Sequence, residues 1–419
     1  MKLLLVGVVC SPVQGTEPSF TWNWAVHLAQ YHDVWTMAYP HDRANVESFI
    51  ANWDKPRPRF IWVRPPKRPD TWIDQWPRRV RLHYLLWQRE VLRQAMALHN
   101  SVGFDLTHHV SWGTISLPPL LWKLPIPFAW GPVGGAQTAP GAFRRYFGMA
   151  WPSEVVRTAR VRLACMSPSV RKAAQRCALA LATNQETADA LRNAGANNVR
   201  MFLDSGLTTE FLPQTPVSRP VKPELTLLWV GSMLPIKALP LALEAIAQTR
   251  DLPLRLLVAG DGPLMQKWRS EARTLGVDRQ VVFLGRVPWQ QMPELYREAD
   301  VFIFTSLRDS FGTQVLEAMA HALPILTLNH QGVGTFVPDD AGIKVPVRSP
   351  RDTVEGLARG IRLLAASPET RAEMGRKGWE FARTQTWERR ARKMSCWYQE
   401  IIESRQMAES HLEQECHAE

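Results

Sequence analysis

The feature that most constrains the fold is a repeated alternation between short apolar runs and longer stretches with apolar residues at helical spacing. In the first half, apolar runs cover residues 2–8, 33–39, 104–110 and 126–131, and "ALALATN" ends a helical stretch in a further run. In the second half they cover 225–230, 254–260, 281–285, 300–305 and 323–328. Strands that alternate with helices are typical of parallel sheets with helices on both faces. The pattern predicts an α/β fold with two Rossmann-like, doubly wound halves.

The alternation breaks between Gly206 and Glu224. The segment "LTTEFLPQTPVSRPVKPE" is rich in Pro, Thr and Ser and has no apolar period, which is typical of an interdomain linker. We therefore expect a first domain over 1–205, a linker over 206–224 and a second domain over 225–385. A helix is expected over 386–405 and a frayed polar tail over 406–419. Two α/β halves joined by a hinge suggest a ligand cleft between them.

Composition agrees with two domains, because 419 residues with 45% hydrophobic content can form two cores. The five cysteines form no C-x-x-C pair and indicate reduced thiols in a cytoplasmic protein. The start, "MKLLLVGVVC", fits either a signal peptide or a buried first strand, and we favour the strand. No apolar run approaches the roughly 18 residues that a membrane-spanning helix needs.

The formal charge of +11 gathers in two stretches and indicates an anionic partner. Residues 53–93 carry eleven Lys or Arg against four acids, interleaved with five Trp, and residues 144–176 carry eight Lys or Arg against Glu154 alone. Cations beside Trp suit an anionic bilayer. We expect an enzyme that is peripheral on the inner face of the plasma membrane, with a lipid-linked or anionic acceptor. The alternative is solvated helix faces with the Trp residues in the core.

Four sharp turns in the second half follow strand ends: "GSMLPIK", "DGP", "RVP" and "LRDSFGT". Ligands of open parallel sheets bind at the carboxyl ends of the strands, so these loops should converge on one ligand.

The last loop leads into "FGTQVLEAMA". Gly312 permits an unusual backbone shape, and the helix that follows presents free N–H groups and its positive dipole end to a phosphate. Glu317 can reach a ribose diol, Asp309 can hold a hydroxyl beyond the phosphates, and Lys237 supplies positive charge. Together these residues indicate a nucleotide-sugar. Alternatively, Asp309 and Glu317 are ordinary solvated acids.

Residues 225–347 resemble the donor domain of retaining glycosyltransferases of the GT-B fold, in the large family four. The resemblance rests on "LLVAGDGP", "VVFLGRVP", "YREADVFIF", "FGTQVLEAMAHALP" and "GIKVPV". It implies two domains facing a cleft, with the terminal helix crossing back to the first domain. It also implies that a sugar moves from a nucleoside diphosphate to an acceptor hydroxyl, by front-face displacement without a protein nucleophile.

By the same resemblance, Glu317 would bind the ribose and Lys237 would stabilise the departing phosphate. The backbone of Phe311, Gly312 and Thr313 would hold the diphosphate, Arg286 and Val287 would lie near the base, and Asp309 would contact the sugar. The expected donor site also includes Gly15 and Gly262. Here Asp309 replaces the family Glu, and Ser232 replaces the family Arg. No clear counterpart of the family's first-domain His exists; the nearby candidates are His108, His109, Gly134 and Gly135.

Three other functions are compatible with parts of the sequence. A nucleotide-sugar epimerase would use the same architecture without an acceptor, and a nucleic-acid-binding protein is suggested only by the charge. A dinucleotide oxidoreductase is disfavoured because "GDGPLM" lacks the third glycine of G-x-G-x-x-G. No D-x-D occurs in the chain, so neither a metal nor another cofactor is expected. The sugar, the base, the acceptor and the oligomeric state stay open.

Overall fold

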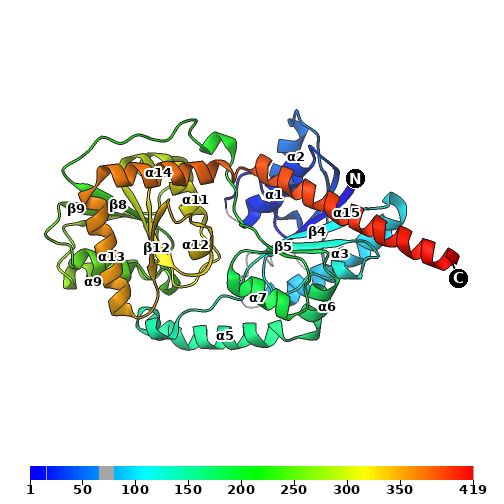
Figure 1. The fold of residues 1–419 in the computed structure, drawn as a ribbon, viewed down its shortest axis with the longest axis horizontal. Coiled ribbons are helices and arrows are strands. Elements are labelled where there is room, and N and C mark those ends of the chain that lie inside the picture. The colour runs from blue at the N-terminus through cyan, green and yellow to red at the C-terminus, as the bar shows by residue number, and fades with distance from the viewer. Residues whose placement is uncertain (16, 66–79, 419) are drawn as a thin grey trace. The chain divides into compact units, whose positions relative to one another are not determined.

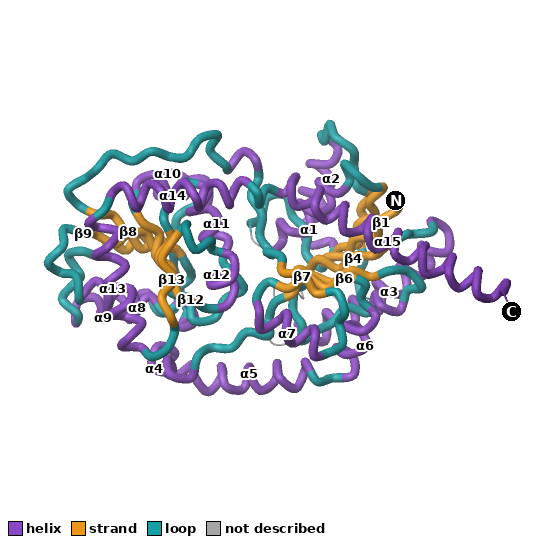
Figure 2. The backbone as a smooth tube through the Cα atoms, viewed as in Figure 1, coloured by secondary structure: helices purple, strands orange, loops and turns teal. Residues whose placement is uncertain are grey.

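The computed structural model describes residues 1–15, 17–65 and 80–418. Contacts divide the chain into two compact units. The first consists of Met1–Ala136, Arg160–Asp204 and Trp387–Glu419, and the second of Gln137–Ala159 and Ser205–Thr386. Each unit is built on its own parallel sheet, drawn as arrows in Figure 1 and as the orange segments in Figure 2.

The sheet of the first unit has the strand order β3-β2-β1-β4-β5-β6-β7 within the described residues, and every neighbouring pair is parallel. The strands are β1 (Lys2–Gly7), β2 (Asp33–Ala38), β3 (Arg59–Trp62), β4 (Leu106–Ser111), β5 (Phe128–Val133), β6 (Leu179–Ala182) and β7 (Val199–Met201). The helices from this part of the chain are α1 (Glu17–Leu28), α2 (Arg43–Ala51), α3 (Val80–Val102), α6 (Pro168–Arg176) and α7 (Gln185–Asn193). The residues of α5 (Trp151–Cys165) up to Ala159 are assigned to the second unit and those from Arg160 to the first.

The sheet of the second unit has the order β10-β9-β8-β11-β12-β13 and is also parallel throughout. Its strands are β8 (Leu225–Val230), β9 (Leu254–Ala259), β10 (Val281–Gly285), β11 (Val301–Phe304), β12 (Ile325–Asn329) and β13 (Gly342–Pro346). Its helices are α4 (Arg144–Phe147), α8 (Leu239–Ala247), α9 (Met265–Thr274), α10 (Met292–Glu298), α11 (Thr313–Ala320), α12 (Gln331–Phe336), α13 (Pro350–Ala366) and α14 (Pro368–Arg383).

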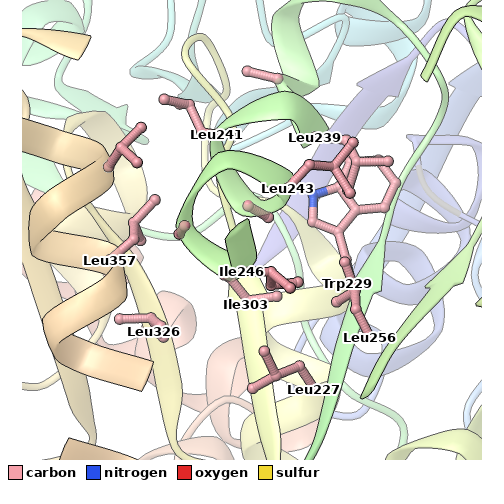
Figure 3. Close-up of a cluster of buried hydrophobic side chains, with 14 of the residues drawn as sticks. Leu227, Trp229, Leu239, Leu241, Leu243, Ile246, Leu256, Ile303, Leu326 and Leu357 are labelled. Carbon is pink, nitrogen blue, oxygen red and sulfur yellow. The ribbon is translucent and has the colours of Figure 1, made fainter. Parts of the chain in front are cut away.

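The core of the second unit lies between its sheet and helices α8 and α13. Figure 3 shows Leu227, Trp229 and Ile303 on strands, with Leu243 and Ile246 of α8 packed over them. These side chains are at most 1% exposed. Burying a large aliphatic side chain contributes about 1.5–3 kcal/mol, so this layer stabilises the packing of α8 on the sheet.

The segment Gln137–Ala159 belongs to the second unit, although the expected boundary at 205 places it in the first domain. Three of its aromatic residues, Phe143, Tyr146 and Phe147, are part of the core that contains α8. In addition, the Arg145 guanidinium donates to Glu244. The sequence around these aromatics carries no strand or long helix pattern, so its place in the fold was not predicted.

The expected linker is fixed to the second unit by Arg219. The guanidinium of Arg219 donates to the carbonyl oxygens of Ala299, Tyr296, Ala322 and His321 at 2.6 to 2.9 Å. These carbonyls lie at the C-terminal ends of α10 and α11, where the helix dipoles favour a cation. Arg219 thereby joins the ends of two helices.

The last helix, α15 (Trp387–Ala418), packs in the first unit, as the resemblance implied. Its residues Trp387, Met394 and Tyr398 lie in a core with Leu3 of β1 and Trp24 of α1. The expected end of this helix at Arg405 is wrong, because the helix continues through the polar tail to Ala418.

The Trp-rich basic stretch 53–93 is only partly described, and Trp72 and Trp76 lie outside the described residues. Trp87 is fully buried and donates to the Val63 carbonyl, while Trp53 and Trp62 pack against a cluster around Trp22. These three Trp residues support the alternative in which the stretch contributes to the core.

Candidate functional site

The strand order of the second sheet reverses between β8 and β11. Strands β9 and β10 continue outward on one side of β8, and β12 and β13 on the far side of β11. In open α/β sheets the loops that leave two such strands diverge and form the ligand crevice. The loops after β8 and β11 are the ones that carry Lys237 and Asp309.

Two hydrogen bonds connect the loop after β8 to the loop after β11. The backbone N–H of Leu307 donates to the Ile236 carbonyl at 2.8 Å, and the Thr305 hydroxyl donates to the Lys237 carbonyl at 3.0 Å. The Lys237 ammonium is ion-paired with the Asp309 carboxylate and lies 5.6 Å from the centre of the Phe304 ring. The predicted cation and the predicted first acid are therefore in direct contact.

The side chain of Gln331 fixes the position of the Asp309 loop by hydrogen bonding. The Gln331 side-chain oxygen accepts the Asp309 N–H at 2.8 Å, and its amide nitrogen donates to the Thr138 carbonyl at 2.9 Å. Gln331 has a φ of 52°, a left-handed conformation that costs a non-glycine residue roughly 1–2 kcal/mol. A Cβ on the neighbouring Gly332 would stand 1.4 Å from the Ser310 carbonyl oxygen, so the loop has no room to shift toward α12.

A buried charge cluster lies beside the same loop. The Glu154 carboxyl is 6% exposed, and its Oε1 lies 2.8 Å from Arg308 Nε and 3.5 Å from Arg157 Nη1. Burial, with a further contribution from Arg308, lowers the pKa of Arg157 to about 10. Two cations therefore share one carboxylate next to Asp309, and Glu154 comes from the segment whose position the sequence did not predict.

Helix α11 begins at the predicted turn. Gly312 has a φ of 101°, which only glycine adopts without strain, and Phe311 is fully buried against the Phe336 ring. The Thr313 hydroxyl is 2.9 Å from the Ser205 hydroxyl. The first N–H groups of an α-helix have no partner in their own helix and favour an anion, so the start of α11 lies where the sequence predicts a phosphate to bind.

Glu317 lies one turn further into α11, and its carboxylate accepts two hydrogen bonds from aromatic side chains. Its Oε1 accepts the Trp289 indole N–H at 3.0 Å, and its Oε2 accepts the Tyr296 hydroxyl at 2.7 Å. Burial raises the pKa of Glu317, although both hydrogen bonds favour its charged form. Each carboxylate oxygen keeps a further lone pair for a ligand hydroxyl. Trp289 and Tyr296 were not predicted from the sequence as members of the site.

The other predicted donor-site residues lie on loops after β8, β9 and β10. Gly262 has a φ of 152°, and a Cβ there would stand 2.9 Å from the Met233 backbone nitrogen, so glycine lets the β8 and β9 loops approach. Met233 in turn donates to the Asp261 carbonyl at 2.8 Å. Ser232 and Arg286 are exposed and Val287 is half-buried.

In the first unit, both predicted histidines are buried. His108 Nε2 donates to the Gly131 carbonyl at 2.7 Å, which leaves Nδ1 to accept the Tyr398 hydroxyl. His109 Nε2 is 2.9 Å from the Tyr84 hydroxyl. Burial lowers the pKa of His108 to about 4 and that of His109 to about 3, so both are neutral near pH 7. With both nitrogens engaged, His108 joins α15 to the sheet.

The two predicted glycines of the first unit connect the ends of β4 and β5. Gly134 donates to the Gly113 carbonyl at 2.7 Å and accepts from Ile115 at 3.0 Å. Gly135 has a φ of 97°, with the Thr114 hydroxyl 2.9 Å from where a Cβ would be. Gly15 is exposed, and a Cβ there would touch nothing.

Glu17, at the start of α1, is a titratable group in the first unit that was not predicted as a site residue. Burial, together with the charge of Asp204, raises its pKa to about 7, against a hydrogen bond from the Gly113 backbone. Its charge also helps to raise the pKa of the Tyr84 phenol. The strand order of the first sheet reverses between β1 and β4. Glu17 begins the helix that follows β1, and Gly113 lies in the loop that follows β4.

The described residues offer neither a metal cluster nor a membrane-spanning helix. No three His, Cys, Asp or Glu side chains gather as a metal ion would require. None of the described helices combines the length and apolar character needed to traverse a bilayer.

Residues 214–381 match the family model described as "Glycosyl transferases group 1". Among curated proteins, the D-inositol 3-phosphate glycosyltransferase of Corynebacterium glutamicum (strain R) is 30% identical over 183 residues, which cover 42% of this chain and 43% of that relative. The corresponding enzyme of Saccharomonospora viridis is 34% identical over 177 residues, or 39% and 40% of the two chains. The chain thus matches less than half the length of these relatives.

Solved structures match nearly the whole chain. Sucrose-phosphate synthase from Thermosynechococcus elongatus superposes with a TM-score of 0.65 at 18% identity, covering 96% of this chain and 99% of that one. Anabaena Alr3699/HepE in complex with UDP and glucose gives 0.59 at 15% identity, covering 96% and 100%. At such identities these matches establish the fold, which is GT-B, and the expected α/β class with two doubly wound sheets is confirmed.

Proposed function

Because residues 214–381 belong to the glycosyl transferases group 1, we propose that the protein is a retaining glycosyltransferase that moves a sugar from a nucleoside-diphosphate sugar to an acceptor hydroxyl. The observation that carries the proposal is the contact between Lys237 and Asp309 beside the N-terminus of α11. A cation, a helix N-terminus and an acid that would bind a sugar hydroxyl would then form one donor site at the point where the strand order reverses.

The donor would be held at two places in and next to α11. Backbone N–H groups of Phe311, Gly312 and Thr313 would receive the diphosphate, because their partial positive charge favours an anion. Glu317 would accept the ribose hydroxyls, since Trp289 and Tyr296 hold both of its oxygens in place.

The remaining predicted residues would form the edges of the donor site. Arg286 and Val287 would lie near the base, and Ser232 and Gly262 would form the edge of the loops after β8 and β9. The name of one structural neighbour, a complex with UDP and glucose, supports a donor of this class.

The proposed reaction is a front-face displacement at the anomeric carbon. The bond from that carbon to the departing phosphate oxygen breaks and the bond to the acceptor oxygen forms on the same face. The acceptor proton passes to the departing phosphate. Negative charge would grow on the diphosphate, which Lys237 and the N–H groups of α11 would stabilise, and such preorganised groups are typically worth about 2.7–4 kcal/mol each. Asp309 would accept a hydroxyl of the sugar.

For the acceptor we propose a lipid-linked or other anionic precursor at the inner face of the plasma membrane. The support is the charge of +11 and the exposed basic residues between 144 and 176. The matched bacterial relatives are named for inositol 3-phosphate, which is also anionic. We propose that no metal and no other cofactor is needed.

A donor panel tests the proposal. UDP-, GDP-, ADP- and dTDP-sugars are offered with and without crude lipid extract, and released nucleoside diphosphate is measured. A glycosyltransferase releases the diphosphate faster when an acceptor is present. The rival epimerase would change the sugar of one donor without an acceptor and without net release. Absence of both signals across the panel would reject the proposal.

A further inference from the structure

Helix α5 (Trp151–Cys165) has its apolar side turned outward. Five small or apolar residues fall at the i, i+3, i+4, i+7, i+11 spacing of a single helix face, and all are exposed: Pro152, Val155, Val156, Ala159 and Leu163. Leu163 is 69% exposed, and Val155 and Val156 are nearly half exposed. Figure 1 draws α5 as one uninterrupted helix, so this face is continuous.

The opposite side of α5 is buried and carries charge. Glu154 is 6% exposed and faces Arg308 and Arg157, and Val161 is also 6% exposed. A helix on the surface of a protein ordinarily buries its apolar side and exposes its charged side. The ion pairs of Glu154 with Arg308 and Arg157 hold the charged side of this helix against the protein. The apolar side is therefore exposed, and packing within the described residues does not account for that exposure.

Arginines border the apolar stripe on both sides. At about 100° per residue, Arg160 projects on one side of the stripe and Arg162 on the other. Both are exposed, and neither forms an ion pair with a carboxylate among the residues that the structure describes. Met149, two residues before the helix, and Met166, directly after it, are 100% and 66% exposed. No exposed acid interrupts residues 144–176, because the single acid there is the buried Glu154.

We propose that this face of α5 lies in the headgroup region of an anionic bilayer. Val155, Val156 and Leu163 would enter the boundary between headgroups and acyl chains, while Arg160 and Arg162 would extend sideways to lipid phosphates. Apolar side chains bordered by cations are the pattern of helices that lie in the plane of a membrane surface. The inference rests on the proposed function only for the location of the acceptor, and it assigns the membrane contact to α5.

The test is flotation of the full chain with phosphatidylcholine vesicles that contain no anionic lipid or roughly one third phosphatidylglycerol. Wild type should float with the anionic vesicles, and binding should weaken at high salt as the Debye length falls to about 3 Å near 1 M. Val156→Asp/Leu163→Asp should lower the partition coefficient at least tenfold, and Arg160→Gln/Arg162→Gln several-fold.

Matched controls carry the same changes elsewhere on the surface. Leu363→Asp/Met407→Asp replaces side chains that are 50% and 64% exposed, and Arg273→Gln/Arg279→Gln removes two exposed arginines from the second unit. Both controls should float like wild type. A circular-dichroism melt at the wild-type temperature for all variants establishes that each is folded.

Three outcomes would overturn the inference: wild type that does not float, α5 variants that float like their controls, or controls that lose binding equally. Loss of self-association rather than of flotation in the Asp variants would instead assign the face to a second copy of the chain. Vesicle binding is measured without any nucleotide-sugar. Failure here therefore leaves the release of nucleoside diphosphate from a water-soluble donor as a separate test of the proposed function.

Discussion

Lys237 and Asp309, which are 72 residues apart in the chain, form an ion pair across the loops that leave β8 and β11. Both side chains are mostly buried, at 15% and 23% exposure. Without a donor the two groups neutralise each other. We expect a bound nucleotide-sugar to exchange this contact, with the diphosphate on Lys237 and a sugar hydroxyl on Asp309. The pair would then keep both side chains oriented before the donor arrives.

Replacement of Lys237 tests the leaving-group role. Lys237→Ala should lower kcat by at least about a hundredfold, because a preorganised partner of the developing charge is typically worth about 2.7–4 kcal/mol. The measurement is release of nucleoside diphosphate under saturating donor. Lys267→Ala, which removes an exposed lysine of α9, serves as the control and should behave like wild type. A rate for Lys237→Ala within a few-fold of wild type would remove Lys237 from the mechanism.

The two hydrogen bonds to the Glu317 carboxylate predict that different substitutions weaken activity and nucleotide binding to different degrees. Glu317→Ala should lower transfer at least about a hundredfold. Trp289→Phe and Tyr296→Phe each remove one hydrogen bond to the carboxylate, which is worth about 1.5–3 kcal/mol when one partner is charged. Both should therefore weaken nucleoside diphosphate binding roughly tenfold or more, with a smaller effect on kcat. Calorimetric dissociation constants check this order, and equal binding by all four proteins would contradict a ribose contact at Glu317.

Arg219 is expected to position the nucleotide end of the site from a distance. Its guanidinium donates to the carbonyls of Tyr296 and His321. Tyr296 donates to the Glu317 carboxylate, and His321 Nδ1 lies 3.0 Å from the Glu317 carbonyl oxygen. Arg219→Lys should raise KM for the donor and cost at least about 3 kcal/mol of unfolding free energy, since several charged hydrogen bonds are lost together. Urea titration measures the stability. The control is Arg362→Lys, because Arg362 pairs with Asp251 at the surface. A loss no larger than that of this control would contradict the role.

Glu17 gives a prediction with a definite sign in pH. Its pKa is raised from 4.5 to about 7 in the folded chain, so between these values the folded state holds more protons than the unfolded one. Raising the pH through this window therefore destabilises the wild type by about 1.4 kcal/mol per unit. Glu17→Gln lacks this penalty, so its stability relative to wild type should increase from pH 4.5 to pH 7. Chemical denaturation at several pH values measures this difference, and a constant difference would contradict the assignment.

Much of the fold could be predicted because most strands are short apolar runs that end in a turn. Strands β1 and β8 through β11 lie where the runs indicated. Strand β3 was missed because its sequence, "RFIW", lies in a basic, proline-rich stretch, and β7 was missed because it has only three residues. The GT-B fold was implied by resemblance and is confirmed.

The site could be predicted only where a single segment of the chain contains both the turn that shapes the backbone and the side chain that would contact the ligand. Gly312 and Glu317 share one turn and helix, so their spacing carries the information. Site residues that come from other segments could not be predicted from any sequence pattern. Gln331 hydrogen-bonds to Asp309, 22 positions away in the chain, and Trp289 hydrogen-bonds to Glu317, 28 positions away. Glu154 was noted only as a lone acid in a basic stretch, and its burial depends on a segment whose packing has no periodic pattern.

The most direct test of the donor site is isothermal titration of a nucleotide-sugar panel into wild type, Lys237→Ala and Glu317→Ala. We predict that at least one donor binds wild type with a dissociation constant below about 1 mM, and that each substitution weakens it at least tenfold while the melting temperature is retained. Binding of no donor by wild type, or equal binding by both substituted proteins, would contradict the account.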